Sequence, residues 1–589
     1  MKKNQSIKLH VIICFLCTVL FWCVLIAGRN INFKSGIGLF ILCAIFFGSM
    51  FFSWMVIKKF SEKNKIAYVL YSLILCFSAC WLVASFRTPG ITFDTWNMYD
   101  MSRYVFADFG YMDFIRQFIV NTHYEMAFPP LFPVLMALVN FVFDIGVLAA
   151  TFICGISSLW IVSLSAVVGK KLGQILSVAL CALFFVSGMY CWLVRAGVSQ
   201  VLNFSILFMI VIVLLYFKLN IKNVLGLAIL ASLGLMCRFD FLAVVVVSFI
   251  FVVVVSFKER KVNDALKFIF SYTLTVLLLS SPWIVYSIKH FGCFFVTDNG
   301  RRLINVVDTD PYTYFSKFCP AQTLFDNFSL WFQAFFDRVY ESLWALESGL
   351  ILYSPFFELI IVAFFLGIFI KYVYKKEFGL KKNEKKDLRK WFVVFLFVGL
   401  ETIYVLTGYG ATRYHIPAFY FSCYIVLSSF LIPLSRSLIE NQKKIKNKNV
   451  LKNVCVATFI LFSFLKCNLS FREGYIFSIF KSALTNSTLY TKEMNLTENE
   501  VFLKNYLKKD VKTICFSKAA SVKSHRFQVL SNLSYVVTPT NISYDNVRDF
   551  VNDFDVNYLY LPDDKTLDIF KLKTNVYETE IPFLYKIDP

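Results

Sequence analysis

Charged residues are scarce in this chain of 589 residues. They make up 16% of it, and only 38 residues are acidic, whereas a soluble globular domain has about 25% charged residues. This scarcity excludes an ordinary soluble domain. Hydrophobic residues instead reach 58%, and phenylalanine alone occurs 68 times. The composition therefore indicates a protein that crosses a membrane many times.

Other features are missing as well, and each absence excludes a class of protein. Cysteine and histidine do not stand at the spacing of a zinc site, so we interpret the 16 cysteines as small apolar residues that pack in a bundle. No internal repeat suggests an inverted-repeat transporter. No clear small-x-small cleavage site follows the apolar stretch near the N-terminus, so we expect that stretch to be a retained first helix.

Thirteen apolar segments are candidates for membrane-spanning helices, which need about 20 apolar residues each. The pair 223–237 and 240–256 is the least distinct, because "CRFD" (237–240) interrupts it and it could be one long broken segment. The thirteen segments are 10–27, 37–57, 66–86, 146–167, 174–190, 199–217, 223–237, 240–256, 265–284, 351–371, 391–408, 415–433 and 451–466.

Lys and Arg outnumber Asp and Glu and bring the net charge to +21. They gather in alternate loops, such as 371–390, which has nine basic and three acidic residues. Basic loops stay in the cytoplasm, so we expect a multi-pass cell-membrane protein with a cytoplasmic N-terminus. This topology accounts for the charge, and we therefore expect no nucleic-acid partner.

The alternation of apolar segments and basic loops divides the chain into three parts. Residues 1–65 hold two N-terminal spans, and 66–466 form a transmembrane core with long external loops at 87–145 and 285–350. The tail 467–589 alternates short β-like runs with polar helical stretches, the pattern of one small α/β domain. We expect an all-α polytopic membrane bundle of about 13 helices with a small extracytoplasmic α/β domain at its C-terminus.

The first external loop opens with two acids, in "ITFDTWNMYDMSRYVF" (91–106). Asp94 stands about one helical turn beyond the third span, and 97–110 reads as an amphipathic helix that lies in the interface plane. A Pro-Pro pair starts a further apolar helix at 130–143, which the span count leaves outside as an interfacial or re-entrant helix. Two interpretations of Asp94 stay open: a helix N-cap and a carboxylate that carries chemistry.

The order of these segments resembles the GT-C glycosyltransferases, in particular the polyprenyl-phosphate-sugar-dependent family of protein mannosyltransferases and the lipid A aminoarabinose transferase. "DTWNMYDMSR" (94–103) is similar to the family's Asp-acid-x-x-Tyr-x-x-x-Ala-Arg motif, with Thr95 in place of the second acid. "PPLFP" (129–133) is similar to its Pro-Pro-Leu-aromatic motif. The resemblance covers about 66–433, and the other similar segments are 233–247, 281–295 and 408–421.

This resemblance implies an integral-membrane glycosyltransferase. It would move a sugar from a polyprenyl-phosphate donor to a cell-envelope glycan, lipid or protein, by inverting displacement at the outer membrane face. Asp94 is then the candidate base, because desolvation near an interface can raise the pKa of a carboxylate. The donor phosphate needs cations, and the phosphate- or substrate-binding candidates are Arg103, His123, Arg301, Arg302, Arg413 and His415.

Asp100 and Glu125 are secondary acids of the same loop. The resemblance leaves a divalent cation open, but Asp94, Asp100, His123 and Glu125 have no compelling ligand spacing, and the metal is unknown. The residue before the Pro-Pro pair, often basic in the family, is Phe128 here. His123 or Glu125 would then have to take over a donor-phosphate contact at that position.

Several of these charged residues also have a purely structural interpretation. Arg238 and Asp240 are expected to pair with each other where two spans meet, since intramembrane charges usually pair. Arg413, at the mouth of a span, could equally be a snorkelling interfacial residue. Arg301 and Arg302 could lie in a solvated loop.

Two other functions compete with the glycosyltransferase. A non-enzymatic transporter or flippase for lipid-linked saccharides predicts charges in the middle of the spans and internal symmetry. Such charges are few here, and the acids cluster at one face. A polysaccharide polymerase or ligase would usually have a large, Arg-rich late external loop, whereas the late loops here are short.

Overall fold

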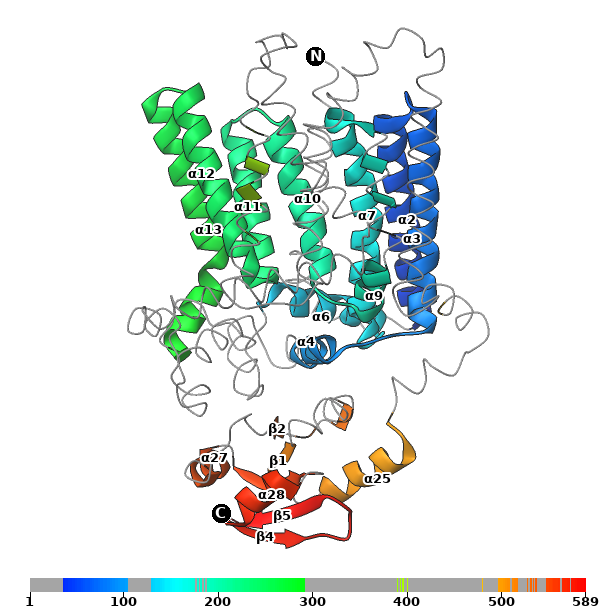
Figure 1. Cartoon of the computed structure of the whole chain (residues 1–589), viewed down its shortest axis with the longest axis vertical. Helices are drawn as coiled ribbons and strands as arrows, with labels where there is room; N and C mark the ends of the chain where they lie inside the picture. Colours follow the sequence, from blue (N-terminus) through cyan, green and yellow to red (C-terminus); the bar gives the residue numbers. More distant parts are fainter. Residues whose placement is uncertain are drawn as a thin grey trace, which may run out of the picture.

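The structure is a computed structural model of the chain (Figure 1). It describes residues 35–103 and 129–291, apart from short gaps between 175 and 187, and most of 496–588, with scattered residues at 389–400 and 479. The expected spans 10–27, 351–371, 415–433 and 451–466, and most of 391–408, lie outside the described residues.

The described helices of the bundle mostly run side by side (Figure 1). Five are long and apolar enough to cross a membrane, or six if a helix pair bent by 117° counts as one span, among the residues that the structure describes. The chain is thus a multi-pass membrane protein. In chain order the helices are α2 (Ser35–Ser61), α3 (Lys65–Arg87), α4 (Phe93–Arg103), α6 (Leu131–Phe143), α7 (Leu148–Leu172), α9 (Gly188–Ala196), α10 (Gln200–Tyr216), α11 (Ile221–Cys237), the 3₁₀ turn η2 (Phe239–Phe241), α12 (Leu242–Glu259) and α13 (Val262–Phe291).

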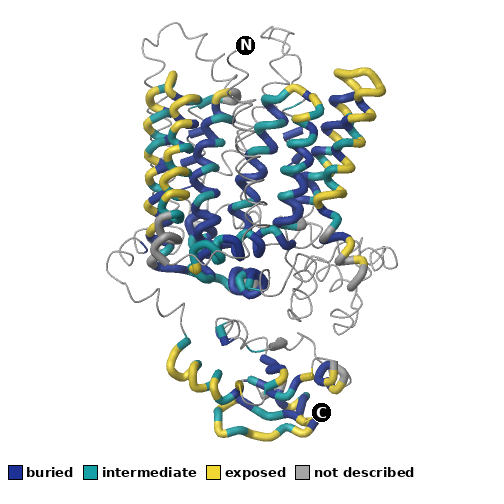
Figure 2. The backbone as a smooth tube through the Cα atoms, turned by 180° about the vertical axis from the view of Figure 1, so that it is seen from behind, coloured by how far each residue is buried: buried dark blue, intermediate teal, exposed yellow. Residues whose placement is uncertain are grey.

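Apolar side chains remain exposed on the outer sides of α2, α3, α12 and α13 (Figure 2). Phe51 of α2 is 62% exposed and Phe270 of α13 is 66% exposed. By contrast, α7 and α10 are largely buried between other helices. An apolar outer surface around a packed centre is the arrangement expected for helices that lie in lipid.

Asparagine caps begin two of the helices at the end of the bundle opposite α4. The Asn64 side chain accepts a hydrogen bond from the Ala67 amide at 3.2 Å, where α3 begins. The Asn220 side chain accepts one from the Asn223 amide at 3.0 Å, where α11 begins. These side chains satisfy amides that the first helical turn leaves without a partner, so the polar turns predicted from the charge pattern also set the helix boundaries.

The uncertain region 223–256 forms two helices. α11 ends at Cys237, η2 follows, and α12 begins at Leu242. The chain can turn this sharply because Gly234 leaves room for the Phe241 ring, which a Cβ at Gly234 would meet at 2.0 Å. The sequence "CRFD" is therefore a junction between helices.

Two expectations for the first external loop can be compared with the structure. The short helix at 130–143 is present as α6, whose 13 residues extend about 20 Å and so do not cross a membrane alone. The amphipathic helix begins at Phe93 and not at Asn97, so Asp94 lies within α4. Met98 and Met101 are both buried, as the expected apolar side requires.

The C-terminal tail contains the expected α/β structure. Its elements are α25 (Glu498–Leu507), β1 (Thr513–Phe516), β2 (Tyr535–Val537), α27 (Val547–Asp553), β3 (Val556–Tyr560), α28 (Asp564–Lys571), β4 (Asn575–Glu578) and β5 (Leu584–Asp588). The sheet order is β2-β1-β3-β5-β4; β1 pairs in parallel with β2 and β3, and β5 pairs antiparallel with β3 and β4.

Alternating side chains of β1 supply two separate hydrophobic cores. Ile514 and Phe516 pack with Leu507 of α25, whereas Cys515 packs with Phe550 of α27 and with α28. This follows from the period of two along a strand, which sends successive side chains to opposite faces of the sheet. Helices therefore cover both faces of the sheet.

Candidate functional site

Three motif segments that are far apart in the sequence meet at one end of the bundle. The helix α4 lies across this end and packs against α6, which in turn contacts α11 (Figure 1). These elements carry the segments 94–103, 129–133 and 233–247. We call this region the α4 end; it also includes the bend between α9 and α10, and the C-terminal sheet lies beyond it (Figures 1 and 2).

Asp94 is the second residue of α4. The Trp96 amide donates to the Thr92 carbonyl at 3.0 Å, so the first helical turn already starts at Thr92. The N-cap position therefore belongs to Thr92, and Asp94 lies in the first turn, where the helix dipole favours a negative charge. The structure describes the backbone of Asp94 but not its side chain, and its catalytic role stays a prediction.

Thr95 fixes the start of α4 to the bend between α9 and α10. Its side chain is fully buried, and its hydroxyl donates to the Ala196 carbonyl at 2.7 Å. The Gly197 carbonyl lies 3.5 Å away, and the Thr92 hydroxyl 2.9 Å away. An acid at this position would direct a carboxylate at two carbonyl oxygens, whereas a hydroxyl can donate. This accounts for threonine where the family pattern has a second acid.

Sequence analysis did not identify Arg195, which holds the segment just before α4. Its Nε donates to the Thr88 carbonyl, and its Nη2 donates to the Pro89 carbonyl at 3.1 Å. Gly90 passes so close that a Cβ there would lie 3.0 Å from the Arg195 Cζ. One signal was available: the charge alternation leaves "LVRAGVS" (193–199) at the same face as Asp94.

Asp100 and Arg103 form an ion pair within α4. Burial raises the pKa of the Asp100 carboxyl, and the Arg103 guanidinium opposes that rise. Arg103 also lies 6.0 Å from the centre of the Tyr99 ring. The structure thus brings together a candidate phosphate-binding cation and a candidate secondary acid, and both roles stay predictions.

The Tyr99 hydroxyl of α4 lies close to the turn that leads from α6 to α7. Burial raises the pKa of its hydroxyl, with Arg103 lowering it and the charges of Asp144 and Asp100 raising it further. A Cβ on Gly146 would lie 3.7 Å from the Tyr99 hydroxyl oxygen. The backbone of Asp144 is left-handed at φ 49° in this turn, and its charge is close enough to act on Tyr99 of α4.

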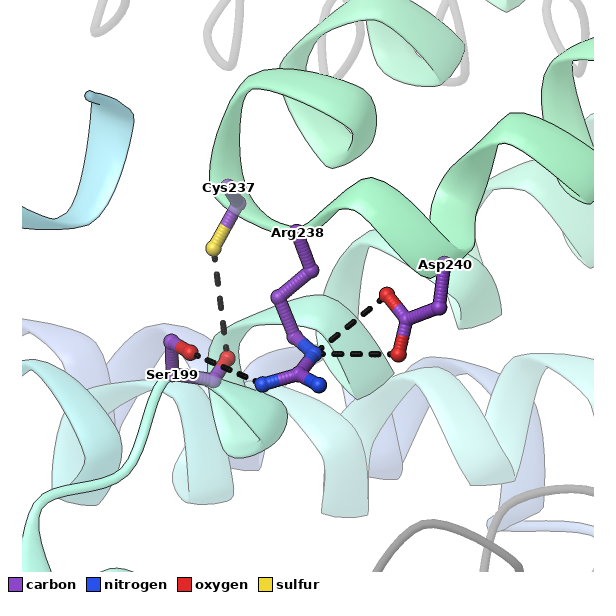
Figure 3. Close-up of polar contacts among 4 residues, drawn as sticks. All are labelled: Ser199, Cys237, Arg238 and Asp240. Carbon is purple, nitrogen blue, oxygen red and sulfur yellow. Dashed lines mark hydrogen bonds and ion pairs between the residues drawn. The ribbon is translucent and has the colours of Figure 1, made fainter. Parts of the chain in front are cut away.

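Arg238 and Asp240 pair with each other, as their position between two spans predicted (Figure 3). The Arg238 Nε lies 3.0 Å from Asp240 Oδ2 and 3.3 Å from Oδ1. The Arg238 Nη1 donates to the Ser199 hydroxyl at 3.5 Å, which links the α11–α12 junction to the start of α10. Asp240 is only 4% exposed, so the pair is a buried part of the α4 end.

Several residues singled out in the sequence lie outside the described part of the chain, and their roles stay predictions. Within the described residues, no three His, Cys, Asp or Glu side chains group as metal ligands. The singled-out residues outside the described part are His123, Glu125, Phe128, Arg301, Arg302, Arg413 and His415.

The C-terminal domain touches the α4 end through Leu530. This side chain packs against a small cluster formed by Trp96 and Val147, which also includes Tyr99. The Leu530 carbonyl accepts a hydrogen bond from Lys504 Nζ of α25 at 3.5 Å. The contact therefore connects the helix that contains Asp94 to the sheet domain.

Among known proteins, this chain is similar to several solved structures. No family model and no curated protein matches the chain. A structure of ArnT from Cupriavidus metallidurans bound to undecaprenyl phosphate is 10% identical, with 87% of this chain and 97% of that chain covered and a TM-score of 0.47. A structure of the oligosaccharyltransferase AglB from Archaeoglobus fulgidus, in complex with an inhibitory peptide and a dolichol-phosphate, is 13% identical, with 85% and 70% covered and a TM-score of 0.45.

Proposed function

We propose that this chain is a membrane glycosyltransferase that takes its sugar from a polyprenyl-phosphate donor, with Asp94 as the base. One observation carries the proposal: three segments that resemble motifs of one transferase family meet at a single end of the bundle. Asp94 lies there in the first turn of α4, next to the buried Thr95. A catalytic carboxylate needs such a fixed backbone, because small misplacements slow a reaction strongly.

The proposed orientation places the α4 end outside the cytoplasm. Helix ends at the opposite end of the bundle carry many basic residues. The Lys170 ammonium of α7 lies 5.2 Å from the Phe60 ring of α2, and Arg389 lies 3.7 Å from Glu259 of α12. Basic helix ends are retained in the cytoplasm. The donor and acceptor would therefore meet at the extracytoplasmic face, where a nucleotide sugar is absent and a lipid-linked sugar is the available donor.

In the proposed reaction, Asp94 takes a proton from the acceptor's nucleophile. The nucleophile forms a bond to the anomeric carbon, and the bond from that carbon to the phosphate oxygen breaks on the opposite face. The electron pair leaves with the polyprenyl phosphate. Cations must balance the charge of this leaving group, and Arg103 is the described candidate that lies on the same helix as Asp94.

The test is sugar transfer by the purified chain in lipid nanodiscs, with polyprenyl-phosphate sugars as donors and crude cell envelope as acceptor. Asp94→Asn removes the base, and transfer should fall by at least about 100-fold, the usual contribution of a general base. Asp144→Asn is a matched control, because Asp144 is an exposed acid at the same end and asparagine tolerates its left-handed backbone.

Transfer at the wild-type rate by Asp94→Asn would contradict the role of Asp94 and direct the search to Asp100 and Glu125. Absence of transfer in every protein, including the wild type, would contradict the proposed reaction. Uptake or flipping of the lipid-linked saccharide by the protein in sealed vesicles would then favour a transporter. Folding of each variant is checked by its elution profile and its unfolding temperature.

A further inference from the structure

We propose that the bend between α9 and α10 is a clamp that positions Asp94, with Arg195 and Thr95 as its positioning residues. This inference rests on the proposed function. It adds Arg195, which lies outside the motif pattern, and gives a role to Thr95, which stands where the pattern has a second acid. Together they hold the backbone on both sides of Asp94.

The first set of hydrogen bonds holds the chain just before Asp94. Arg195 donates from two different nitrogens, Nε and Nη2, to the carbonyls of Thr88 and Pro89. The chain leaves α3 at Arg87 and begins α4 at Phe93, so these carbonyls belong to the connection itself. The next residue is Gly90, and it has no Cβ that would press on the guanidinium. Arg195 therefore fixes the path by which the chain approaches Asp94.

The second contact, a hydrogen bond from Thr95, holds the chain directly after Asp94. The Thr95 hydroxyl donates to the carbonyl of Ala196, the residue that follows Arg195. One short stretch of the α9–α10 bend thus holds the chain at 88–89 and again at 95. Asp94 lies between these two points, and the helical hydrogen bond from the Trp96 amide to the Thr92 carbonyl limits its backbone further.

The clamp is itself fixed to the rest of the bundle. The Trp81 Nε1 of α3 donates to the Cys191 carbonyl at 2.9 Å, and the Cys154 thiol of α7 donates to the Val198 carbonyl at 3.2 Å. Gly197 has φ 69°, and a Cβ there would lie 2.8 Å from the Ala150 Cβ. The bend is therefore a rigid base, held by α3 and α7, and a rigid base is what a positioning device requires.

The chemistry of arginine suits the first set of hydrogen bonds. Its planar guanidinium presents several N–H groups in a fixed fork, whereas the lysine ammonium is a single point on a flexible stem. Arg195→Lys keeps the positive charge but cannot reproduce two donors at fixed separation. Thr95→Ser keeps the hydroxyl donor, whereas Thr95→Val keeps the shape and removes the donor. These pairs separate positioning from charge and from packing.

The experiment combines kinetics with amide hydrogen exchange on the full-length protein in nanodiscs. In Arg195→Lys and Thr95→Val, we expect kcat to fall by about 10- to 100-fold with KM for the donor lipid little changed, because misplacement of a reacting group costs about 100-fold. Thr95→Ser should stay within about threefold of wild type, since its hydroxyl can make the same bond. Amides of residues 88–96 should exchange faster in the two impaired variants only.

The clamp would be overturned by unchanged exchange across residues 88–96 in both impaired variants or by wild-type kcat in both. A loss of activity that Thr95→Ser shares, or a rise in KM alone, would also contradict positioning. The exchange measurement does not depend on the reaction. Absence of transfer in every protein would therefore end the proposed function, and wild-type transfer by Asp94→Asn would end the role of Asp94, while exchange would still decide whether Arg195 and Thr95 hold this segment.

Discussion

The α4 end contains two chain junctions, and an arginine holds each of them in a different way. At the α11–α12 junction, Arg238 pairs with Asp240, only two residues away, so the contact is local and its charges balance. At the α3–α4 junction, Arg195 comes from another helix and donates to the carbonyls of Thr88 and Pro89. A local pair can be recognised in the sequence, whereas a long-range grip on the backbone exists only after folding.

The largest effect is expected from breaking the local pair. Asp240→Ala leaves the Arg238 guanidinium at a mostly buried position, where its side chain is 16% exposed. Removing one partner of a buried ion pair costs about 3–5 kcal/mol, so the apparent unfolding temperature in nanodiscs should fall clearly. Asp568→Ala is the control, because Asp568 is exposed on α28. An equal effect of the two variants would contradict a structural role of the pair.

A double variant sharpens this test. Arg238→Met combined with Asp240→Leu removes both charges and keeps much of the volume, which is often close to neutral for a buried pair. The double variant should therefore be more stable than Asp240→Ala. If it transfers sugar at the wild-type rate, the pair is structural; a selective loss of transfer would instead assign Arg238 to substrate binding.

A smaller effect is expected from strain at Gly197, in the bend between α9 and α10 that follows Arg195. Gly197→Ala adds a Cβ at φ 69°, 2.8 Å from the Ala150 Cβ, and should destabilise the protein by about 1–3 kcal/mol. Gly226→Ala on α11 is the matched control, because nothing lies within 4 Å of its Cβ position, and alanine favours a helix by about 1 kcal/mol. Thermal unfolding of both variants should change in opposite directions; equal behaviour would contradict a tightly packed bend.

The smallest effect is expected where Leu530 of the C-terminal domain packs against α4. Leu530→Ala shortens the side chain that packs on the cluster of Trp96 and Val147, and it should cost about 1 kcal/mol or less, as for a partly buried side chain. Amide exchange of α4 should rise slightly. Phe502→Ala is the control, since Phe502 is 64% exposed on α25. Unchanged exchange in α4 would mean that the sheet domain does not support it.

Much of the fold could be predicted because apolar runs and basic turns are local signals. The expected spans 37–57, 66–86 and 265–284 correspond to α2, α3 and α13, with ends displaced by a few residues. The strands β4 and β5 were not predicted. β4 is an edge strand and is mostly exposed, so no apolar alternation marks it. β5 lies inside the sheet, but its buried residues stand at its first and fourth positions, which is not the period of two of a half-buried strand.

The site was less predictable than the fold for a physical reason. Asp94 and the ion pair of Arg238 could be named from local patterns, whereas Arg195 acts through carbonyl oxygens, and every residue carries one. The hydroxyl of Thr95 poses the same problem, since its partner is the carbonyl of Ala196. Contacts between a side chain and a distant backbone leave no complementary residue type in the sequence, so they appear only in three dimensions.

The lengths of the central helices have a consequence for the α4 end. α10 and α11 each have 17 residues, whereas α2 has 27 and α13 has 30. At the rise of an α-helix, 17 residues extend about 25 Å, short of a hydrocarbon core of about 30 Å. The Tyr216 hydroxyl donates to the Val167 carbonyl and aligns α10 with α7 at the end opposite α4, so the deficit falls at the α4 end. Because α10 is largely buried between other helices, this shortfall is filled by protein and not by a thinner bilayer: α4 lies across this end of the bundle and occupies the depth that the short central helices leave (Figure 1).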